Sequence, residues 1–398
     1  MRRLFVTIVY IATLFFLANT NVEANQTTIK ISQDTVARLH LQHEAVKYIT
    51  LYKGQQFVAA KVEDHWEIKV GNGKVTIASR FATPSNSSIA NAKLNNKVEI
   101  NTIHFANVYP KHEKKGKLIA TIAKNMRISS NGRKGDFYEV IIGGRKGYIH
   151  YKDVELDKGV PILIYHHFVE NQKNTAFRDS LSVYDIDLFE QQMHYLKNNN
   201  FTTITLQDFD LWLQRKQNLP AKAVVLTFDD ANLSVPQLVY PILKQYGMRG
   251  ATFIIGDRVK VETPEFNMLK VQFAGFKELA MISDIIDLEH HTYALHRFNT
   301  ETKRGYLQDT KLNDLRLDFK KNTEVIQQAN STSHPKYFAY PYGKYNKNQE
   351  IALVDSGISL AFLNKGGKAK INSSRLYVPR VPIQATTTLA QFKQLVTN

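Results

Sequence analysis

The 398-residue sequence contains no cysteine, which excludes disulfides, thiolate zinc sites and cysteine nucleophiles. Any bound metal must therefore be held by His, Asp or Glu side chains. Acidic residues are also few: 36 Asp and Glu stand against 52 Lys and Arg, which gives a formal net charge of +16. Hydrophobic residues make up 43% of the chain, enough for ordered cores, and the length fits two or three domains.

The N-terminus has the pattern of an export signal. Arg2 and Arg3 precede an apolar run over residues 4–17, and residues 22–24 match the positions that a signal peptidase reads. We expect a signal peptide over residues 1–24, cleaved after Ala24. The alternative is an uncleaved membrane anchor, although the run is shorter than the ~20 apolar residues of a spanning helix. Both interpretations predict a secreted or cell-surface protein, associated with the cell wall.

The excess of positive charge indicates an anionic partner. Removing residues 1–24 leaves a net charge of +15, because Arg2, Arg3 and Glu23 are lost. Export argues against nucleic acid, so we expect binding to an anionic cell wall or matrix instead. The alternative is that the charge only keeps the protein soluble, since Lys and Arg are scattered along the chain rather than grouped.

The first half of the chain reads as two small all-β modules. Residues 26–83 and 101–157 contain short alternating strands separated by turns, and residues 84–100 read as a polar linker. A strand-like segment before a Gly-rich turn recurs at an offset of 72 residues: residues 64–70 precede a turn, and so do residues 136–142. This offset predicts a weak internal repeat.

Residues 101–157 resemble a bacterial SH3-like wall-associated module, on the basis of residues 106–109, 136–140 and 147–150. Residues 26–83 match such a module more loosely. The resemblance implies two SH3-like modules that bind cell-wall material. The alternative is a pair of small β-barrels that only separate the enzyme from its anchor.

From residue 158 onward, apolar strands alternate with amphipathic helices. The strands expected from this pattern cover residues 160–165, 223–228, 251–255, 337–340 and 360–362. One long helix is expected around Leu315, Phe319 and Ile326, and another, kinked at Pro241, runs from Val235. The alternation predicts a parallel sheet covered by helices, and the length of residues 158–398 fits one distorted (β/α) barrel. In such a barrel the chemistry lies where the strands end.

Two adjacent carboxylates, Asp229 and Asp230, come directly after the apolar strand 223–228. Grouping two such charges is costly unless a cation or a proton compensates. One carboxylate can therefore bind a metal while the other accepts a proton. The alternative is that the pair simply begins a helix, because Asp is a good N-cap.

A histidine cluster follows another strand-like segment. Within residues 289–296, His290, His291 and His296 supply imidazoles suited to zinc, cobalt, nickel or iron. A strand end followed by a turn could bring His291 and His296 to one metal ion. With one Asp they would form a set of two His and one carboxylate, leaving positions open for water and substrate. The alternative is a surface or capping cluster.

Two further segments also close expected strands. Residues 338–343 hold a Pro–Tyr–Gly turn that could aim a backbone N–H into a site, and residues 165–167 hold two histidines. A histidine at the mouth of a barrel can act as a general acid. Taken singly, each segment is more often structural.

Together these motifs occur in family order across the domain. Residues 158–398 resemble the NodB-type polysaccharide deacetylases, carbohydrate esterase family 4, and among them the biofilm poly-β-1,6-N-acetylglucosamine deacetylases. The matching segments are residues 161–167, 227–230, 291–296, 339–343 and 378–381. The resemblance implies a metal-dependent hydrolase that releases acetate from N-acetylglucosamine polymers. It implies one divalent metal ion, with zinc favoured over cobalt, nickel or iron, and neither a nucleotide cofactor nor nucleic acid.

Carried over by position, the resemblance implies six site residues. Asp229 would be the general base, His166 the general acid, and Tyr342 would offer a backbone N–H to the oxyanion. The implied metal ligands are Asp230, His291 and His296.

The chain departs from the family pattern at several positions. It has Ala231 where the wider family has Gly, Ala339 where that family has Arg, and Ala294 where the biofilm branch often has an acidic residue. We expect Arg380 to orient Asp229 in place of the missing Arg. The late Leu-x-His-Asp motif of the wider family is absent, which is why His166 is assigned as the acid.

Two other functions remain open at this point. The same chemistry could act on peptidoglycan N-acetylglucosamine, as wall-associated modules would favour. The protein could also be a non-catalytic wall-binding protein with a decayed enzyme domain, although Asp229, Asp230, His291 and His296 are all intact.

Overall fold

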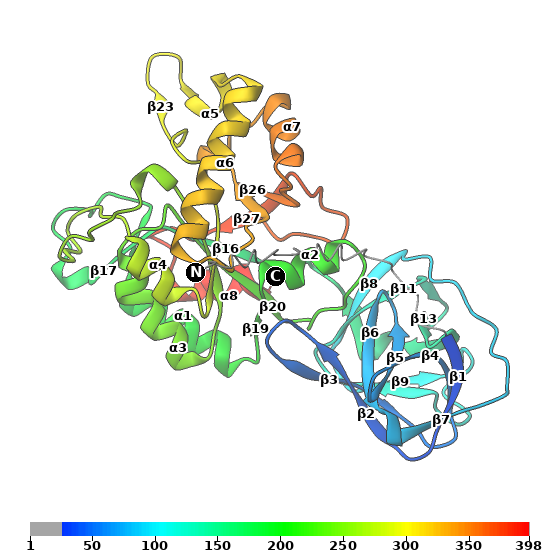
Figure 1. Ribbon diagram of the computed structural model, residues 1–398. Helices are drawn as coiled ribbons and strands as arrows, with labels where there is room; N and C mark the ends of the chain where they lie inside the picture. The colour runs from blue at the N-terminus through cyan, green and yellow to red at the C-terminus, as the bar shows by residue number, and fades with distance from the viewer. Residues whose placement is uncertain (1–25, 398) are drawn as a thin grey trace, which may run out of the picture.

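The computed structural model describes residues 26–397, which form a β-rich region and an α/β barrel (Figure 1). The expected signal peptide, residues 1–24, lies outside the described residues. Within residues 26–397 no helix combines the length and the apolarity needed to cross a bilayer.

The second half of the chain is a closed parallel barrel, as the alternation of strands and helices predicts. Seven strands follow one another in the order β16, β27, β26, β25, β22, β21 and β20, and a parallel pairing between β20 and β16 closes the ring. Their bounds are β16 Ile162–Tyr165, β20 Ala223–Asp229, β21 Gly250–Ile254, β22 Ile286–His290, β25 Tyr337–Ala339, β26 Leu360–Gly366 and β27 Val378–Pro382. A short β19 (Thr202–Thr203) extends the start of β20.

Helices surround the barrel (Figure 1). They are α1 Ile186–Asn198, α2 Leu206–Leu213, α3 Tyr240–Tyr246, α4 Phe276–Ile282, α5 Tyr306–Asp309, α6 Leu312–Ala329, α7 Lys347–Asp355 and α8 Leu389–Thr397. The long helix expected from Leu315, Phe319 and Ile326 is α6, and all three side chains are buried. Their spacing places them on one face of the helix, against the barrel.

The helix expected from Val235, with a kink at Pro241, is different in the structure. Residues Val235–Val239 form a π-helical turn, η4, and α3 begins directly after it. Pro241 therefore lies in the first turn of α3, where a missing N–H costs no helical hydrogen bond. Gly247 ends α3 in the left-handed conformation with φ 64°, as its position in the sequence predicts.

The first half of the chain is antiparallel β structure. Its strands are β1 Gln26–Ile31, β2 Thr35–His40, β3 Ala45–Leu51, β4 Gln56–Val62, β5 His65–Val70, β6 Gly73–Ala78, β7 Ala82–Pro84, β8 Val98–Thr102, β9 Ala106–Tyr109, β10 Ala120–Ile122, β11 Arg127–Ser130, β12 Arg133–Lys134, β13 Phe137–Ile142, β14 Arg145–His150 and β15 Val154–Leu156. Strands from both expected modules belong to one twelve-stranded sheet, because β3 pairs with β10 and β5 with β13. The β-rich region is thus confirmed, while its SH3-like character and module boundaries stay predictions.

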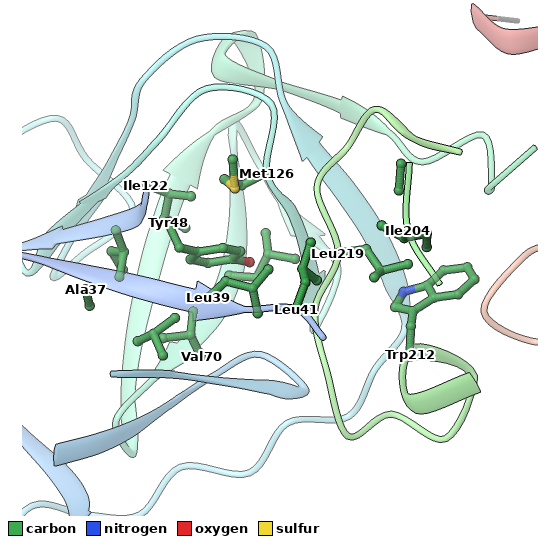
Figure 2. Packing of buried hydrophobic residues seen from close by; sticks show 14 of the residues in the cluster. Ala37, Leu39, Leu41, Tyr48, Val70, Ile122, Met126, Ile204, Trp212 and Leu219 are labelled. Carbon is green, nitrogen blue, oxygen red and sulfur yellow. The ribbon is translucent and has the colours of Figure 1, made fainter. Parts of the chain in front are cut away.

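One hydrophobic cluster joins the β-rich region to the barrel. In Figure 2, Trp212 and Leu219 from the barrel lie beside Leu41 and Met126 of the β-rich region, and all four are buried. Polar contacts reinforce this joint: the side-chain amide of Asn218 donates to the carbonyl of Val70 at 2.8 Å. The two regions therefore share a core.

Arg127, which belongs to the β-rich region, stabilises the contact between this region and the barrel. Its guanidinium is fully buried, pairs with Asp157 at 3.0 Å and donates to the carbonyls of Pro220 and Ala221 at 2.9 and 3.2 Å. It also lies over the ring of Trp212, 5.2 Å from the centroid. Because Pro220 and Ala221 precede β20, the β-rich region sits at the amino end of that strand.

Candidate metal centre

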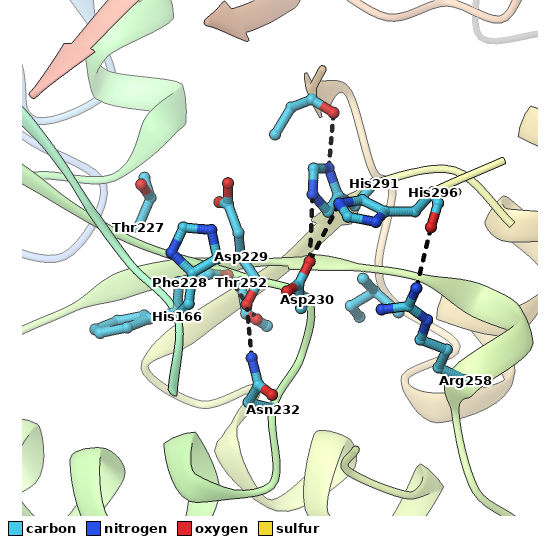
Figure 3. Close-up of polar contacts among 12 residues, drawn as sticks. His166, Thr227, Phe228, Asp229, Asp230, Asn232, Thr252, Arg258, His291 and His296 are labelled. Carbon is cyan, nitrogen blue, oxygen red and sulfur yellow. Dashed lines mark hydrogen bonds and ion pairs between the residues drawn. The ribbon is translucent and has the colours of Figure 1, made fainter. Parts of the chain in front are cut away.

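The carboxylate pair lies at the carboxyl end of β20, as its position in the sequence predicts. Asp229 is the last residue of the strand and is buried. Asp230 and Ala231 follow in the left-handed region, with φ 75° and 53°. This abrupt change of backbone direction separates the two carboxylates, so that each meets different partners (Figure 3).

Asp229 is held by a buried arginine from the neighbouring part of the barrel. Both of its oxygens accept hydrogen bonds from Arg380 on β27, at 2.8 Å each. Arg380 also donates to the hydroxyl of Thr227 and the carbonyl of Leu363. The expected orientation of Asp229 by Arg380 is confirmed. Burial alone would raise the pKa of the Asp229 carboxyl, but the Arg380 guanidinium holds that pKa below its usual value.

Asp230 faces the two histidines that the sequence pairs with it. Its Oδ1 lies 3.5 Å from Nε2 of His291 and 3.4 Å from Nε2 of His296 (Figure 3). One possible ligand atom from each of the three residues lies within 4.8 Å of the others. Asp230 follows β20, and the two histidines follow β22. The barrel brings the carboxyl ends of these two strands together.

The donor set fits a divalent metal ion. Oδ1 of Asp230 is buried and has no hydrogen-bond partner within residues 26–397, a costly state for a carboxylate unless a cation compensates it. Nδ1 of His291 donates to the carbonyl of Ala339 at 2.8 Å, which leaves Nε2 as the free lone pair facing Asp230. Burial lowers the pKa of His296 to about 4, so its imidazole is neutral near pH 7 and can act as a ligand.

The segment that carries both histidines is fixed by Asp318, a residue that our sequence analysis missed. The Asp318 carboxylate on α6 accepts the N–H groups of Tyr293 and Ala294, both at 2.8 Å. Burial raises the pKa of Asp318 to about 6. Its signal in the sequence is an acidic residue between Leu315 and Phe319 on the apolar face of α6.

The other two members of the cluster at the end of β22 point away from the metal ligands. His290 contacts Asn322 and Thr323 on α6, and the Glu289 carboxylate accepts the N–H groups of Lys336 and Tyr337. Successive side chains on a strand alternate in direction, which separates His290 from His291.

His166 follows β16 and lies beside Asp229 in Figure 3. Its Nδ1 is 3.4 Å from the hydroxyl of Tyr184, a second residue that we did not anticipate. Burial and the nearby Asp229 and Asp230 raise the pKa of that hydroxyl, so Tyr184 stays protonated and can act as a donor. The adjacent His167 is buried elsewhere, between Ser234 and the carbonyl of Met268.

Tyr342 lies over the other side of the mouth. Its ring centroid is 4.7 Å from that of His296 and 5.3 Å from that of Phe298. The backbone at Tyr342 is left-handed, with φ 57° and ψ 11°, within the short turn Pro341–Gly343 that follows β25. The structure thus brings all six expected site residues to one end of the barrel.

A comparison with protein families matches residues 216–361 to the polysaccharide deacetylases. The chain contains a polysaccharide deacetylase domain. This family consists of hydrolases that remove acetyl groups from polysaccharides, and its matched segment includes Asp229, Asp230, His291, His296 and Tyr342.

Curated proteins and solved structures are also similar to this chain. A poly-β-1,6-N-acetyl-D-glucosamine N-deacetylase of Staphylococcus aureus is 27% identical over 197 residues, which cover 49% of this chain and 66% of the relative. A Streptococcus pyogenes deacetylase, solved with acetate, superposes with a TM-score of 0.53 at 19% identity over 60% of this chain and 99% of its own.

A solved polysaccharide deacetylase of Bacillus cereus superposes on more of this chain. It superposes with a TM-score of 0.50 at 16% identity, over 92% of this chain and 100% of its own. At this identity the likeness concerns the fold alone, and it includes part of the β-rich region.

Proposed function

We propose that this polysaccharide deacetylase is a metal-dependent N-deacetylase of N-acetylglucosamine polymers and that its substrate is poly-β-1,6-N-acetylglucosamine. The observation that carries the proposal is the convergence of Asp230, His291 and His296 next to Asp229, whose carboxylate is kept ionised by Arg380. A metal-ligand set beside a separate proton acceptor is one arrangement that can hydrolyse an unactivated amide.

Asp230, His291 and His296 would hold one divalent ion, with zinc favoured by the two-imidazole set and cobalt, nickel or iron as alternatives. Such an ion supplies Lewis acidity and lowers the pKa of water. The carbonyl of Ala339 fixes the tautomer of His291, and Asp318 fixes the segment between the two histidines. These contacts orient the ligands before any ion arrives.

The remaining residues would divide the proton transfers. Asp229 accepts the proton of the attacking water, and Arg380 keeps the carboxylate oriented for that step. The backbone N–H of Tyr342 donates to the oxyanion that develops on the acetyl group. His166 then protonates the glucosamine nitrogen as it leaves, which releases acetate and a free amine.

The linkage of the substrate is the finer part of the proposal. It rests on the name of the Staphylococcus aureus relative, of which this chain spans only 66%. The rival substrate is peptidoglycan N-acetylglucosamine, and the second rival is a protein that binds walls without catalysis. The export signal and the anionic wall partner also remain proposals, supported by the N-terminal sequence and the net charge of +16.

The test is acetate release from β-1,6-linked and β-1,4-linked N-acetylglucosamine oligomers of equal length, with the metal-loaded protein and Asp229→Asn as the inactive control. We expect faster release from the β-1,6 oligomer. Faster release from the β-1,4 oligomer would favour the peptidoglycan substrate. No release from either, above the control, would favour the non-catalytic alternative.

A further inference from the structure

A groove of about 1070 Å³ lies on the β-rich region, between β4, the β5–β6 turn and the connecting segment 91–96. The loop after α2 closes it with Arg215 and Lys216, which belong to the barrel side of the joint. The groove therefore exists only where the two regions meet.

The groove is separate from the candidate metal centre. Arg215 and Lys216 precede β20 and lie toward its amino end, whereas Asp229 ends that strand. Seven residues of extended chain span ~20 Å. The groove and the metal ligands therefore lie toward opposite ends of this strand.

The charges that line the groove are almost all positive. Five basic side chains and a single acidic one, Glu67, belong to its lining. Lys69 and Lys74 stand directly opposite each other in the β5–β6 hairpin, an arrangement that destabilises a sheet when both carry the same charge. Glu67 pairs with Lys74 at 2.7 Å, and no carboxylate within residues 26–397 forms an ion pair with Lys69.

Two buried polar atoms of the lining residues lack partners. Nη1 of Arg215 and Oδ1 of Asn96 make no hydrogen bond within residues 26–397. A guanidinium can only donate, so it needs an acceptor, and an anion is the strongest one. An amide oxygen needs a donor such as a hydroxyl. A polymer that carries anions and hydroxyl groups offers both kinds of partner.

We propose that this basic groove, defined by Lys69, Lys74, Lys93, Arg215 and Lys216, binds a linear hydroxylated polyanion. Polyol-phosphate and uronate polymers share this chemistry, with regularly spaced anions and hydroxyl groups along one chain. Binding there would hold the barrel close to material that contains such a polymer, while leaving the catalytic end free for another strand. The proposal does not depend on which linkage joins the sugars of the deacetylated substrate.

The probes are an oligomer of glycerol phosphate, an oligogalacturonate and a neutral N-acetylglucosamine oligomer, each titrated against the full chain at low and high salt. We expect binding of at least one anionic probe, weakening as salt rises because screening reduces the attraction of exposed charges. The preferred anionic probe shows whether phosphate or carboxylate is the source.

The groove variant is Lys69→Gln combined with Lys74→Gln and Arg215→Gln. Its matched control is Lys111→Gln combined with Lys114→Gln and Lys115→Gln, three exposed lysines outside the groove that change the net charge equally. We expect about tenfold weaker binding or more in the groove variant and little change in the control.

Arg215→Lys should weaken binding less than Arg215→Gln, because it keeps the charge but loses the forked geometry. Acetate release from a short soluble oligomer should be the same in wild type, groove variant and control, which verifies folding and separates this proposal from the enzymatic one. An equal loss of binding in both triple variants would overturn the proposal. So would a wild-type protein that binds the neutral oligomer and neither of the anionic ones.

Discussion

The barrel and the β-rich region use their charged residues in opposite ways. At the barrel mouth, Asp229 is buried against Arg380, and Asp230 is half-buried beside two imidazoles. The groove lysines of the β-rich region, Lys69, Lys74 and Lys93, are exposed, and among residues 26–397 only Lys74 of these three has an ion-pair partner. The difference shows that catalysis needs a few charges held rigidly and desolvated, whereas binding of an anionic polymer can rely on many solvated ones.

The largest effects should come from breaking the carboxylate pair. Asp229→Asn should retain the metal, because Asp230 and both histidines remain, but it should lower turnover by ~10²–10⁴-fold through loss of the proton acceptor. Asp230→Asn should lower metal content and turnover together, since a neutral amide is a poorer ligand than a carboxylate. Metal analysis and acetate release, measured on the same samples, check both.

If Asp229→Asn loses the metal while Asp230→Asn keeps it, the two roles are exchanged. Unchanged acetate release in both variants would contradict the catalytic assignment of the whole pair.

The next largest effect should come from the joint between the two regions. Arg127→Ala leaves Asp157 buried without its cation, and breaking such a pair costs ~3–5 kcal/mol of the free energy of unfolding. The control is Arg133→Ala, since Arg133 pairs with Asp136 on the exposed surface. An exposed pair contributes ~0–1 kcal/mol. Chemical denaturation of the full chain measures both.

The two tryptophans report on the two regions separately, because Trp66 lies in β5 and Trp212 in α2. In Trp66→Phe and Trp212→Phe backgrounds the remaining fluorescence should report the same unfolding midpoint. Separate midpoints, or an Arg127→Ala variant as stable as Arg133→Ala, would show that the shared core does not couple the regions.

A smaller effect should follow from Arg380→Lys. The lysine keeps the charge but loses the two-point contact, so the pKa of Asp229 should rise. The lowered pKa stabilises the fold above the ordinary pKa of Asp, and this contribution disappears as the pH falls through the folded value. Because Asp229 must be ionised to accept a proton, its raised pKa should move the acidic limb of the pH–rate profile to higher pH.

Arg316→Lys, a change at an exposed pair with Asp355, is the matched control and should leave the profile in place. An acidic limb that does not move in Arg380→Lys would mean that Asp229 is not the group that limits the rate at low pH.

The smallest effect concerns the turn after the pair. Ala231 has φ 53°, a conformation that costs a residue with a Cβ about 1–2 kcal/mol. Ala231→Gly should stabilise the fold by about 1 kcal/mol or less, because glycine relieves this strain but gains entropy when unfolded. Thermal unfolding checks the change, and a lower midpoint would show that the Ala231 methyl makes contacts worth more than the strain.

Sequence patterns specify the barrel better than they specify the β-rich region. Local apolar runs predict most of the barrel strands, although β27 (VPRVP) was not predicted, and the polar residues that end β20 and β22 are local signals too. The pairing of β3 with β10 joins residues about seventy positions apart, and no short pattern records it. The sequence patterns therefore predicted two separate modules and not the sheet that they share.

The same reason explains what was missed at the site. The ligands were predictable because they follow strands whose ends must meet. Asp318 reaches the histidine segment from a distant helix, and Tyr184 reaches His166 from β18 (Val183–Asp185), so their roles depend on tertiary packing. The π-helical turn before α3 contains Pro236 and is followed by Pro241, and no periodic signal in the sequence marks it.

The central claim is that Asp230, His291 and His296 hold the ion on which deacetylation depends. The most direct measurement is acetate release from a soluble N-acetylglucosamine oligomer before chelation, after chelation, and after titration with zinc. The account predicts that chelation abolishes release and that one equivalent of zinc restores it, while a His291→Ala variant recovers nothing at the same metal concentration. Undiminished release by the chelated protein, confirmed to be free of metal, would contradict it.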